Sequence, residues 1–141
     1  MKKLICILIL LSLFLLTACA YTDERLAKNM VWKFANDDNY MEFTGTVVET
    51  RDTSLVVLKS NDLSEYFGQS LDDEYWCLIF SKDDILPEIG SEIQFVTVPY
   101  HFYNGYYLPI VELTIDGETL FPFEEGKDLL IKWAYRFAET D

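Results

Sequence analysis

Basic residues, histidine and cysteine are scarce in this 141-residue sequence, and each scarcity argues against a class of function. Lysine and arginine number 11 against 24 acidic residues, so the net charge is -13. A chain this acidic repels nucleic acid, whose binding needs basic residues to displace counterions. With one histidine and three cysteines, the sequence has little material for metal sites or nucleophilic catalysis. We therefore expect no nucleic-acid partner, metal, cofactor or catalytic residue.

The remaining composition is that of a folded domain. Apolar residues make up 50% of the chain and aromatic residues 16%, which is too much for a disordered chain. The length suits one domain with one main core.

The first 18 residues have the character of a targeting segment. Lys2 and Lys3 form a basic start, and residues 4–16 are apolar except for Ser12. A helix over this run would be about 20 Å long, shorter than the ~30 Å hydrocarbon core of a bilayer. The run is therefore interpreted as the hydrophobic region of a signal peptide and not as a membrane span.

The apolar run ends in Leu16-Thr17-Ala18-Cys19, which resembles the lipobox of bacterial lipoproteins. The resemblance implies diacylglyceryl transfer to the Cys19 thiol, with fatty acids such as palmitate, and cleavage before Cys19. It also implies that the mature protein is anchored by lipid to the extracytoplasmic face of the cell membrane. The alternative is plain secretion, because Ala18-Cys19-Ala20 fits the small-x-small rule with cleavage after Ala20.

Hydrophobic periodicity predicts two terminal helices around a group of strands. Apolar residues recur at helical spacing between residues 22 and 36, and again after residue 124 in one stripe of Leu129, Leu130, Trp133 and Phe137. Alternation at period two predicts strands over 42–49, 54–60, 74–80, 91–103 and 106–116, with an extension over 118–123. Strand 74–80 is apolar enough to be buried on both faces. Residues 61–73 are expected to form a polar loop with one helical turn around 64–67.

The last two strands are predicted to form a hairpin. Asn104-Gly105 is the favoured pair for a type I′ turn. Pro99 and Pro109 lack the N–H donor, so we expect the ladder to be bulged or splayed beside them. The turn predicts three facing pairs, which are Tyr103 with Tyr106, Val98 with Val111, and Val96 with Leu113.

The strand pattern carries a second resemblance. Its residues are Phe43-x-Gly45-x-Val47-Val48, then Leu86-x-x-x-Gly90-Ser91-x-Ile93, then the hairpin. The pattern is similar to small OB-like domains of uncharacterised function on Gram-positive lipoproteins. The resemblance implies a mainly β fold, a five-stranded OB-like barrel with flanking terminal helices. The chain divides into a signal peptide (1–18), an anchor and N-terminal helix (19–38), the barrel (39–123) and a C-terminal helix (124–141). One departure is that OB barrels carry a helix between strands three and four, where 81–90 offers one turn at most.

Aromatic residues gather around the expected hairpin tip and are the candidate ligand-binding residues: Tyr100, Phe102, Tyr103, Tyr106 and Tyr107. Aromatic faces stack on sugars and suit protein interfaces, so the expected partner is a glycan or an envelope protein. The alternative is cross-strand packing that stiffens the hairpin. His101, in the same segment, is interpreted as structural or solvent-facing.

Two-thirds of the basic residues of the mature chain lie in its terminal segments: Arg25, Lys28, Lys33, Lys127, Lys132 and Arg136. We hypothesise that the terminal helices pack together and face the membrane, where each base contributes about 1 kcal/mol near anionic lipid. The alternative is that the bases pair with nearby acids, such as Asp128 four residues before Lys132.

Acidic pairs and Cys77 are the remaining candidates for chemistry. The acids at 37–38, 72–74 and 83–84 lack the spacing of a calcium loop and are interpreted as solvated loop charge. The paired carboxylates of a glycosidase are the alternative, since their separation depends on the tertiary fold. Cys77 lies in an apolar run and is interpreted as a small buried hydrophobe, because a nucleophile would need His101 beside it.

These observations predict a membrane-anchored extracytoplasmic lipoprotein that acts as a binding or interaction module and not as an enzyme. Two alternatives remain, a small carboxylate-dependent hydrolase of the cell envelope and an inhibitory or structural lipoprotein. A hydrolase predicts a concave pocket holding a carboxylate of raised pKa, whereas a binding module predicts an exposed aromatic patch.

Intact-mass spectrometry of the native protein tests the anchor. We expect a chain that begins at Cys19 and carries the mass of a diacylglyceryl group. A free, unmodified amino terminus at Tyr21 would show plain secretion instead.

Overall fold

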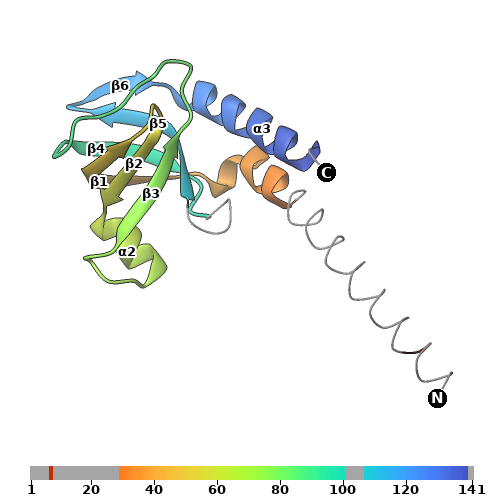
Figure 1. Ribbon diagram of the computed structural model, residues 1–141, viewed down its shortest axis with the longest axis horizontal. Helices are drawn as coiled ribbons and strands as arrows, with labels where there is room; N and C mark the ends of the chain where they lie inside the picture. Colours follow the sequence, from red (N-terminus) through yellow and green to blue (C-terminus); the bar gives the residue numbers. More distant parts are fainter. Residues whose placement is uncertain (1–6, 8–28, 101–106, 140–141) are drawn as a thin grey trace.

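The computed structural model describes residues 7, 29–100 and 107–139, with side chains up to residue 136 (Figure 1). The strands in these ranges are β1 (Met41–Arg51), β2 (Leu55–Lys59), β3 (Glu74–Ile79), β4 (Glu92–Thr97), β5 (Tyr107–Ile115) and β6 (Glu118–Phe121). The helices are η1 (Asp37–Asn39), α2 (Asn61–Phe67) and α3 (Phe123–Glu139), preceded by a helical segment over 29–35. No helix in the described ranges is long and apolar enough to cross a membrane.

The strands form one sheet that closes on itself. Their order is β3-β2-β1-β4-β5-β6, and a further pairing between β3 and β5 joins β1 to β5 into a ring. The β3–β5 pair is parallel and every other pair is antiparallel. The predicted fold class, mainly β and barrel-like with flanking helices, is confirmed. The extension expected after the fifth strand is β6.

Strand β1 shows the alternation that builds the barrel wall. Phe43, Gly45 and Val47 point into the barrel, whereas Thr44 and Thr46 point outward. Strand β1 pairs with β2 on one side and with β4 on the other, so the backbones of both strands lie close to it. A Cβ at Gly45 would lie 3.1 Å from the carbonyl oxygen of Lys59, which explains why a glycine occupies this inward position.

Two apolar clusters hold the molecule together. The first fills the barrel with buried side chains of β1 to β6 and Leu63 of α2, the largest being Phe95, Phe121, Leu58, Leu63, Leu108, Ile110 and Leu113. The second lies against the outer wall of β4 and β5 and joins the terminal helical elements through Met30, Phe34, Val98, Val111, Leu130 and Ala134. The terminal helical elements therefore share one core, as the sequence analysis expected, and Figure 1 shows segment 29–35 beside α3.

Helix α3 is seated directly on the backbone of β5. A Cβ at Gly126 would lie 2.0 Å from the carbonyl oxygen of Val111, so only glycine permits this approach. The first turn of α3 is fixed from both sides. The Phe123 N–H donates to Glu112 Oε2 of β5 at 3.2 Å, and Glu125 Oε1 accepts from the Lys82 N–H at 2.8 Å.

The N-terminal segment is locked onto α3 by polar contacts. The Tyr40 hydroxyl donates to the Phe34 carbonyl, and the Tyr40 ring meets Phe123 edge to face at 4.9 Å between centroids. Lys127 pairs with Asp37 and lies 5.8 Å from the Tyr40 ring centroid. Burial raises the pKa of the Tyr40 hydroxyl, so it stays a protonated donor at physiological pH.

The predicted register of the hairpin is wrong. Phe95 faces Leu113 and Val96 faces Glu112, so Val96 does not face Leu113. The register shifts again between Val96 and Thr97, where Thr97 faces Ile110, and this agrees with the irregularity expected near the prolines. A slip of one residue moves a side chain to the opposite face, so Val96 lies outside the barrel and Phe95 inside it. The tip, 101–106, lies outside the described residues.

Three local expectations also need correction. Strand β1 runs over Met41–Arg51 and is longer than the predicted 42–49. The segment expected to hold one helical turn contains the two-turn helix α2, with Ser60 as its N-cap and Gly68 in the left-handed conformation at its end. Strand β3 is buried on its inner face only, because Trp76 and Leu78 are half-buried on the outer wall.

Gly126→Ala tests the contact between α3 and β5. Alanine in a helix is normally favourable, but here it forces α3 off Val111, and we expect a loss of at least about 2 kcal/mol of unfolding free energy. The measurement is chemical denaturation followed by circular dichroism. Lys132→Ala, on the exposed side of α3, is the control and should change stability by less than about 0.5 kcal/mol. A neutral or stabilising Gly126→Ala would contradict this close packing.

Candidate functional site

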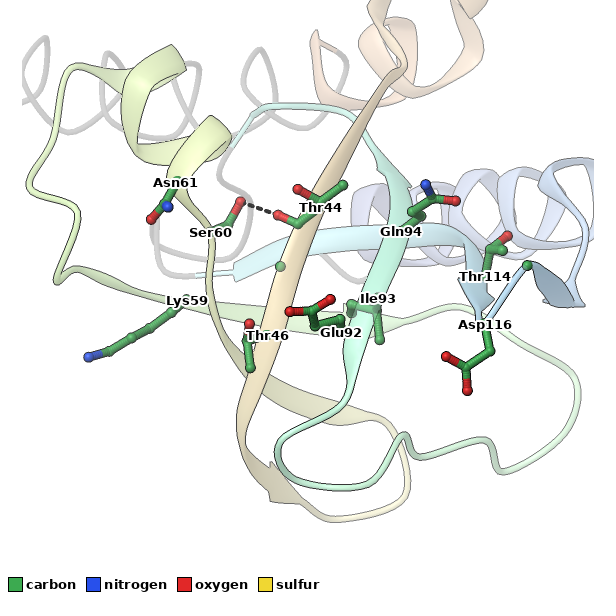
Figure 2. A pocket seen from close by; sticks show the side chains of 12 residues that line it. Thr44, Thr46, Lys59, Ser60, Asn61, Glu92, Ile93, Gln94, Thr114 and Asp116 are labelled. Carbon is green, nitrogen blue, oxygen red and sulfur yellow. Dashed lines mark hydrogen bonds between the residues drawn. The ribbon is translucent and has the colours of Figure 1, made fainter.

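A polar groove crosses the outer wall of the barrel where β1, β4 and the end of β5 lie side by side (Figure 2). Its volume is about 630 Å³, within the range of ligand pockets. The lining comes from four parts of the chain: Thr44, Gly45 and Thr46 of β1; Lys59, Ser60 and Asn61, where β2 ends and α2 begins; Glu92, Ile93 and Gln94 of β4; and Thr114, Asp116 and Gly117 around the turn after β5.

Strand register orders these side chains into two rows. Thr46 of β1 faces Lys59 of β2 on one side and Glu92 of β4 on the other. Two residues along β4, Gln94 lies between Thr44 and Thr114. The first row thus has a positive and a negative end, and the second consists of neutral hydroxyl and amide groups.

The edge of the groove at α2 is held by one carboxylate. Asp62 Oδ2 accepts from the Thr44 N–H at 2.8 Å and from Thr44 Oγ1 at 3.2 Å. Asp62 Oδ1 lies 2.5 Å from Ser60 Oγ, and Ser60 Oγ also lies 2.6 Å from the Thr44 carbonyl oxygen. Ser60 Oγ in turn accepts from the Leu63 N–H at 3.2 Å. These contacts tie the first turn of α2 to the centre of β1.

An aromatic face lies elsewhere on the barrel, on the outer wall of β3 and β5. Trp76 and Tyr107 are register partners in the parallel pair, with ring centroids 6.2 Å apart in an edge-to-face arrangement. The Arg51 guanidinium lies 4.4 Å from the Trp76 ring centroid, a cation–π contact. We call Arg51, Trp76 and Tyr107 the aromatic face.

An ion pair orients the arginine of this face. Arg51 Nε donates to Glu49 Oε1 at 2.6 Å and its Nη2 to Glu49 Oε2 at 3.2 Å. Hydrogen bonding between the two groups lowers the pKa of the Glu49 carboxyl and raises the pKa of Arg51. Both side chains are nearly half exposed, so a ligand can compete for the guanidinium.

The described members of the predicted aromatic site are Tyr100 and Tyr107, and both are half-buried against the second cluster. The Lys33 ammonium lies 3.7 Å from the Tyr100 ring centroid. Phe102, Tyr103 and Tyr106 lie outside the described residues, as does His101. Tyr107 is therefore the residue that the aromatic face shares with the predicted aromatic site.

The predicted membrane-facing bases are in different environments. The Lys127 side chain is only 16% exposed and pairs with Asp37, and Lys132 Nζ lies 2.8 Å from Asp128 Oδ2. For these two lysines the structure shows pairing with acids. Lys33 is half-buried under its contact with Tyr100, and Arg136 is exposed on α3. Arg25 and Lys28 lie outside the described residues.

Cys77 is not placed for nucleophilic chemistry, and the acidic residues form no metal-binding cluster among the described residues. Cys77 is fully buried in the barrel, and burial raises the pKa of its thiol, which disfavours the nucleophilic thiolate. Within residues 29–100 and 107–139, no three His, Cys, Asp or Glu side chains are grouped so as to hold a metal ion.

Neither Trp76 nor the groove was predicted from the sequence. Trp76 stood inside an apolar run that was expected to be buried, although the alternation of β3 places it outside with Leu78. The groove depends on the register of three strands and the position of α2, which no local pattern specifies.

No protein-family model and no curated protein matches the sequence.

Proposed function

We propose that this chain is a lipid-anchored, extracytoplasmic lipoprotein whose barrel is a binding module for an envelope glycan or protein. Cys19 supplies the anchor, and the partner docks on the aromatic face together with Phe102, Tyr103 and Tyr106, which are close to Tyr107 in the sequence. The observation that carries the proposal is the pairing of Trp76 with Tyr107 on the outer wall, with Arg51 over the indole ring.

The chemistry of this face suits recognition rather than catalysis. Aromatic rings provide large contact areas with little loss of conformational entropy, and they stack on sugar rings or pack against protein side chains. Arg51 adds a planar donor that can bind a carboxylate or phosphate of the partner when its ion pair with Glu49 breaks. Three further aromatic residues, Phe102, Tyr103 and Tyr106, lie within five positions of Tyr107 in the sequence and are proposed to take part in the same recognition.

The anchor keeps this surface near the cell membrane. Only nine residues separate Cys19 from residue 29, where the described helical segment begins. Since an extended residue spans at most about 3.6 Å, this connection reaches no further than about 35 Å. The partner is therefore expected close to the outer surface of the membrane.

A pull-down from solubilised membranes tests this function. We expect the parent protein to capture its partner and a variant with Tyr103→Ser, Tyr106→Ser and Tyr107→Ser to lose at least about tenfold of that capture. Because Tyr107 is only half-buried, the melting temperature should fall by less than about 5 °C.

The matched control is the Tyr66→Ser, Tyr135→Ser variant. These tyrosines are 51% and 53% exposed and lie on α2 and α3, whereas the residues of the aromatic face lie on β1, β3 and β5. The control should capture as much partner as the parent. Equal losses in both variants, or full capture by the triple variant, would contradict the proposal. A collapse of stability in the triple variant would show that the tyrosines serve packing instead.

A further inference from the structure

We propose that the polar groove of Figure 2 binds a hydroxylated ligand that carries a free ammonium group, such as an oligosaccharide of amino sugars. The groove and the aromatic face share no residue, so this site goes beyond the proposed function. It can be tested independently of that function.

The charges of the groove favour a cation at one end. Ile93 and Ile115 are register partners; Glu92 precedes Ile93 at the start of β4, and Asp116 follows Ile115 in the turn after β5. Both acids line the groove, whereas Lys59 stands at the far end of its row, beyond Thr46. With strands about 4.8 Å apart, Lys59 and Glu92 are separated by two strand spacings, and no ion pair joins them among the described residues. The two carboxylates are thus open to an ammonium group of a ligand.

The floor between the charged ends supplies hydrogen bonds. Within the described ranges, most polar side chains of the lining make no hydrogen bond or ion pair with the protein: Thr46, Lys59, Asn61, Glu92, Gln94 and Asp116. Hydroxyl and amide groups both donate and accept, which is what a ligand hydroxyl requires. Their free donors and acceptors match a ligand with several hydroxyl groups.

Other ligand classes fit the groove poorly. Its lining holds no aromatic ring for a nucleobase and one base against two acids, which disfavours phosphate. An extended peptide cannot add as a strand, because β1 and β4 are each paired on both sides. The only large apolar residue in the lining, Ile93, is 2% exposed and offers no pocket for a peptide side chain.

The groove is also held in shape before a ligand arrives. The Asp62 carboxylate and the Ser60 hydroxyl bind Thr44 through its N–H, hydroxyl and carbonyl groups, so β1 and the start of α2 keep a fixed distance. At the other end Asp116 and Gly117 both have positive φ values, 53° and 78°, in the tight turn to β6. A preformed site loses less entropy on binding.

The test compares two oligosaccharides that differ in one group. The full-length chain in detergent is titrated, by ligand-observed NMR, with a tetramer of β-1,4-glucosamine and with its fully N-acetylated counterpart at a pH where the amines are charged. We expect the free amine to bind about tenfold more tightly, and its affinity to fall as NaCl rises from about 20 to about 200 mM.

Two double variants test whether the preference for the free amine depends on the carboxylates of the groove. Glu92→Gln with Asp116→Asn should reduce the preference for the amine to about one. Asp83→Asn with Asp84→Asn removes the same charge from exposed residues outside the groove and should keep the preference. Tyr107→Ser, on the aromatic face, should also keep it.

Three results would overturn the proposal. They are equal affinity for the two tetramers, an unchanged preference in the Glu92/Asp116 variant, and an equal loss in the Asp83/Asp84 variant. The last result would mean that net charge alone attracts the amine. All four acids are exposed, so the variants are expected to fold, and their melting temperatures verify this.

Discussion

Strand β5 pairs with three other strands and carries α3, and its parallel pairing with β3 closes the ring on which the rest of the structure depends. Without this pairing β3 would be an open edge, and Cys77 and Ile79 would lose the neighbours that bury them on the inner side. The same pairing makes Trp76 and Tyr107 neighbours on the outer side. One set of backbone hydrogen bonds therefore builds both the core and the aromatic face.

The closed ring separates two kinds of outer surface. The wall of β3 and the first half of β5 is aromatic and carries one oriented guanidinium, whereas the wall of β1, β4 and the end of β5 is hydroxylated and carries carboxylates. Between them, α3 and segment 29–35 cover the outer wall through the second cluster and are tied together by Lys127, Asp37 and Tyr40. The proposed anchor at Cys19 joins the barrel on this helical side, whereas the two proposed binding surfaces lie on the strands.

Local patterns were enough to predict most elements and the barrel, but not how the elements meet. Alternation in residues 42–49 located β1, and the strand predicted over 106–116 agrees with β5 to within one residue at each end. The predicted hairpin register is off by one residue at Val96 and by two residues at Thr97, with a β-bulge between them, and sequence patterns do not count such slips. The requirement for glycine at position 126 could not be predicted either. It arises only because the backbone of Val111, 15 residues earlier in the chain, lies against α3 at this point. Both candidate surfaces depend on contacts between strands distant in sequence, and this is why only Tyr107 of the aromatic face was anticipated.

The most direct measurement is the NMR cross-relaxation between the indole protons of Trp76 and the ring protons of Tyr107 in the full-length chain in detergent. The two residues are 31 positions apart, so proximity requires the β3–β5 pairing. The account predicts a direct cross-peak, because the rings meet edge to face with centroids 6.2 Å apart. A folded protein that lacks this cross-peak would contradict ring closure and, with it, the aromatic face.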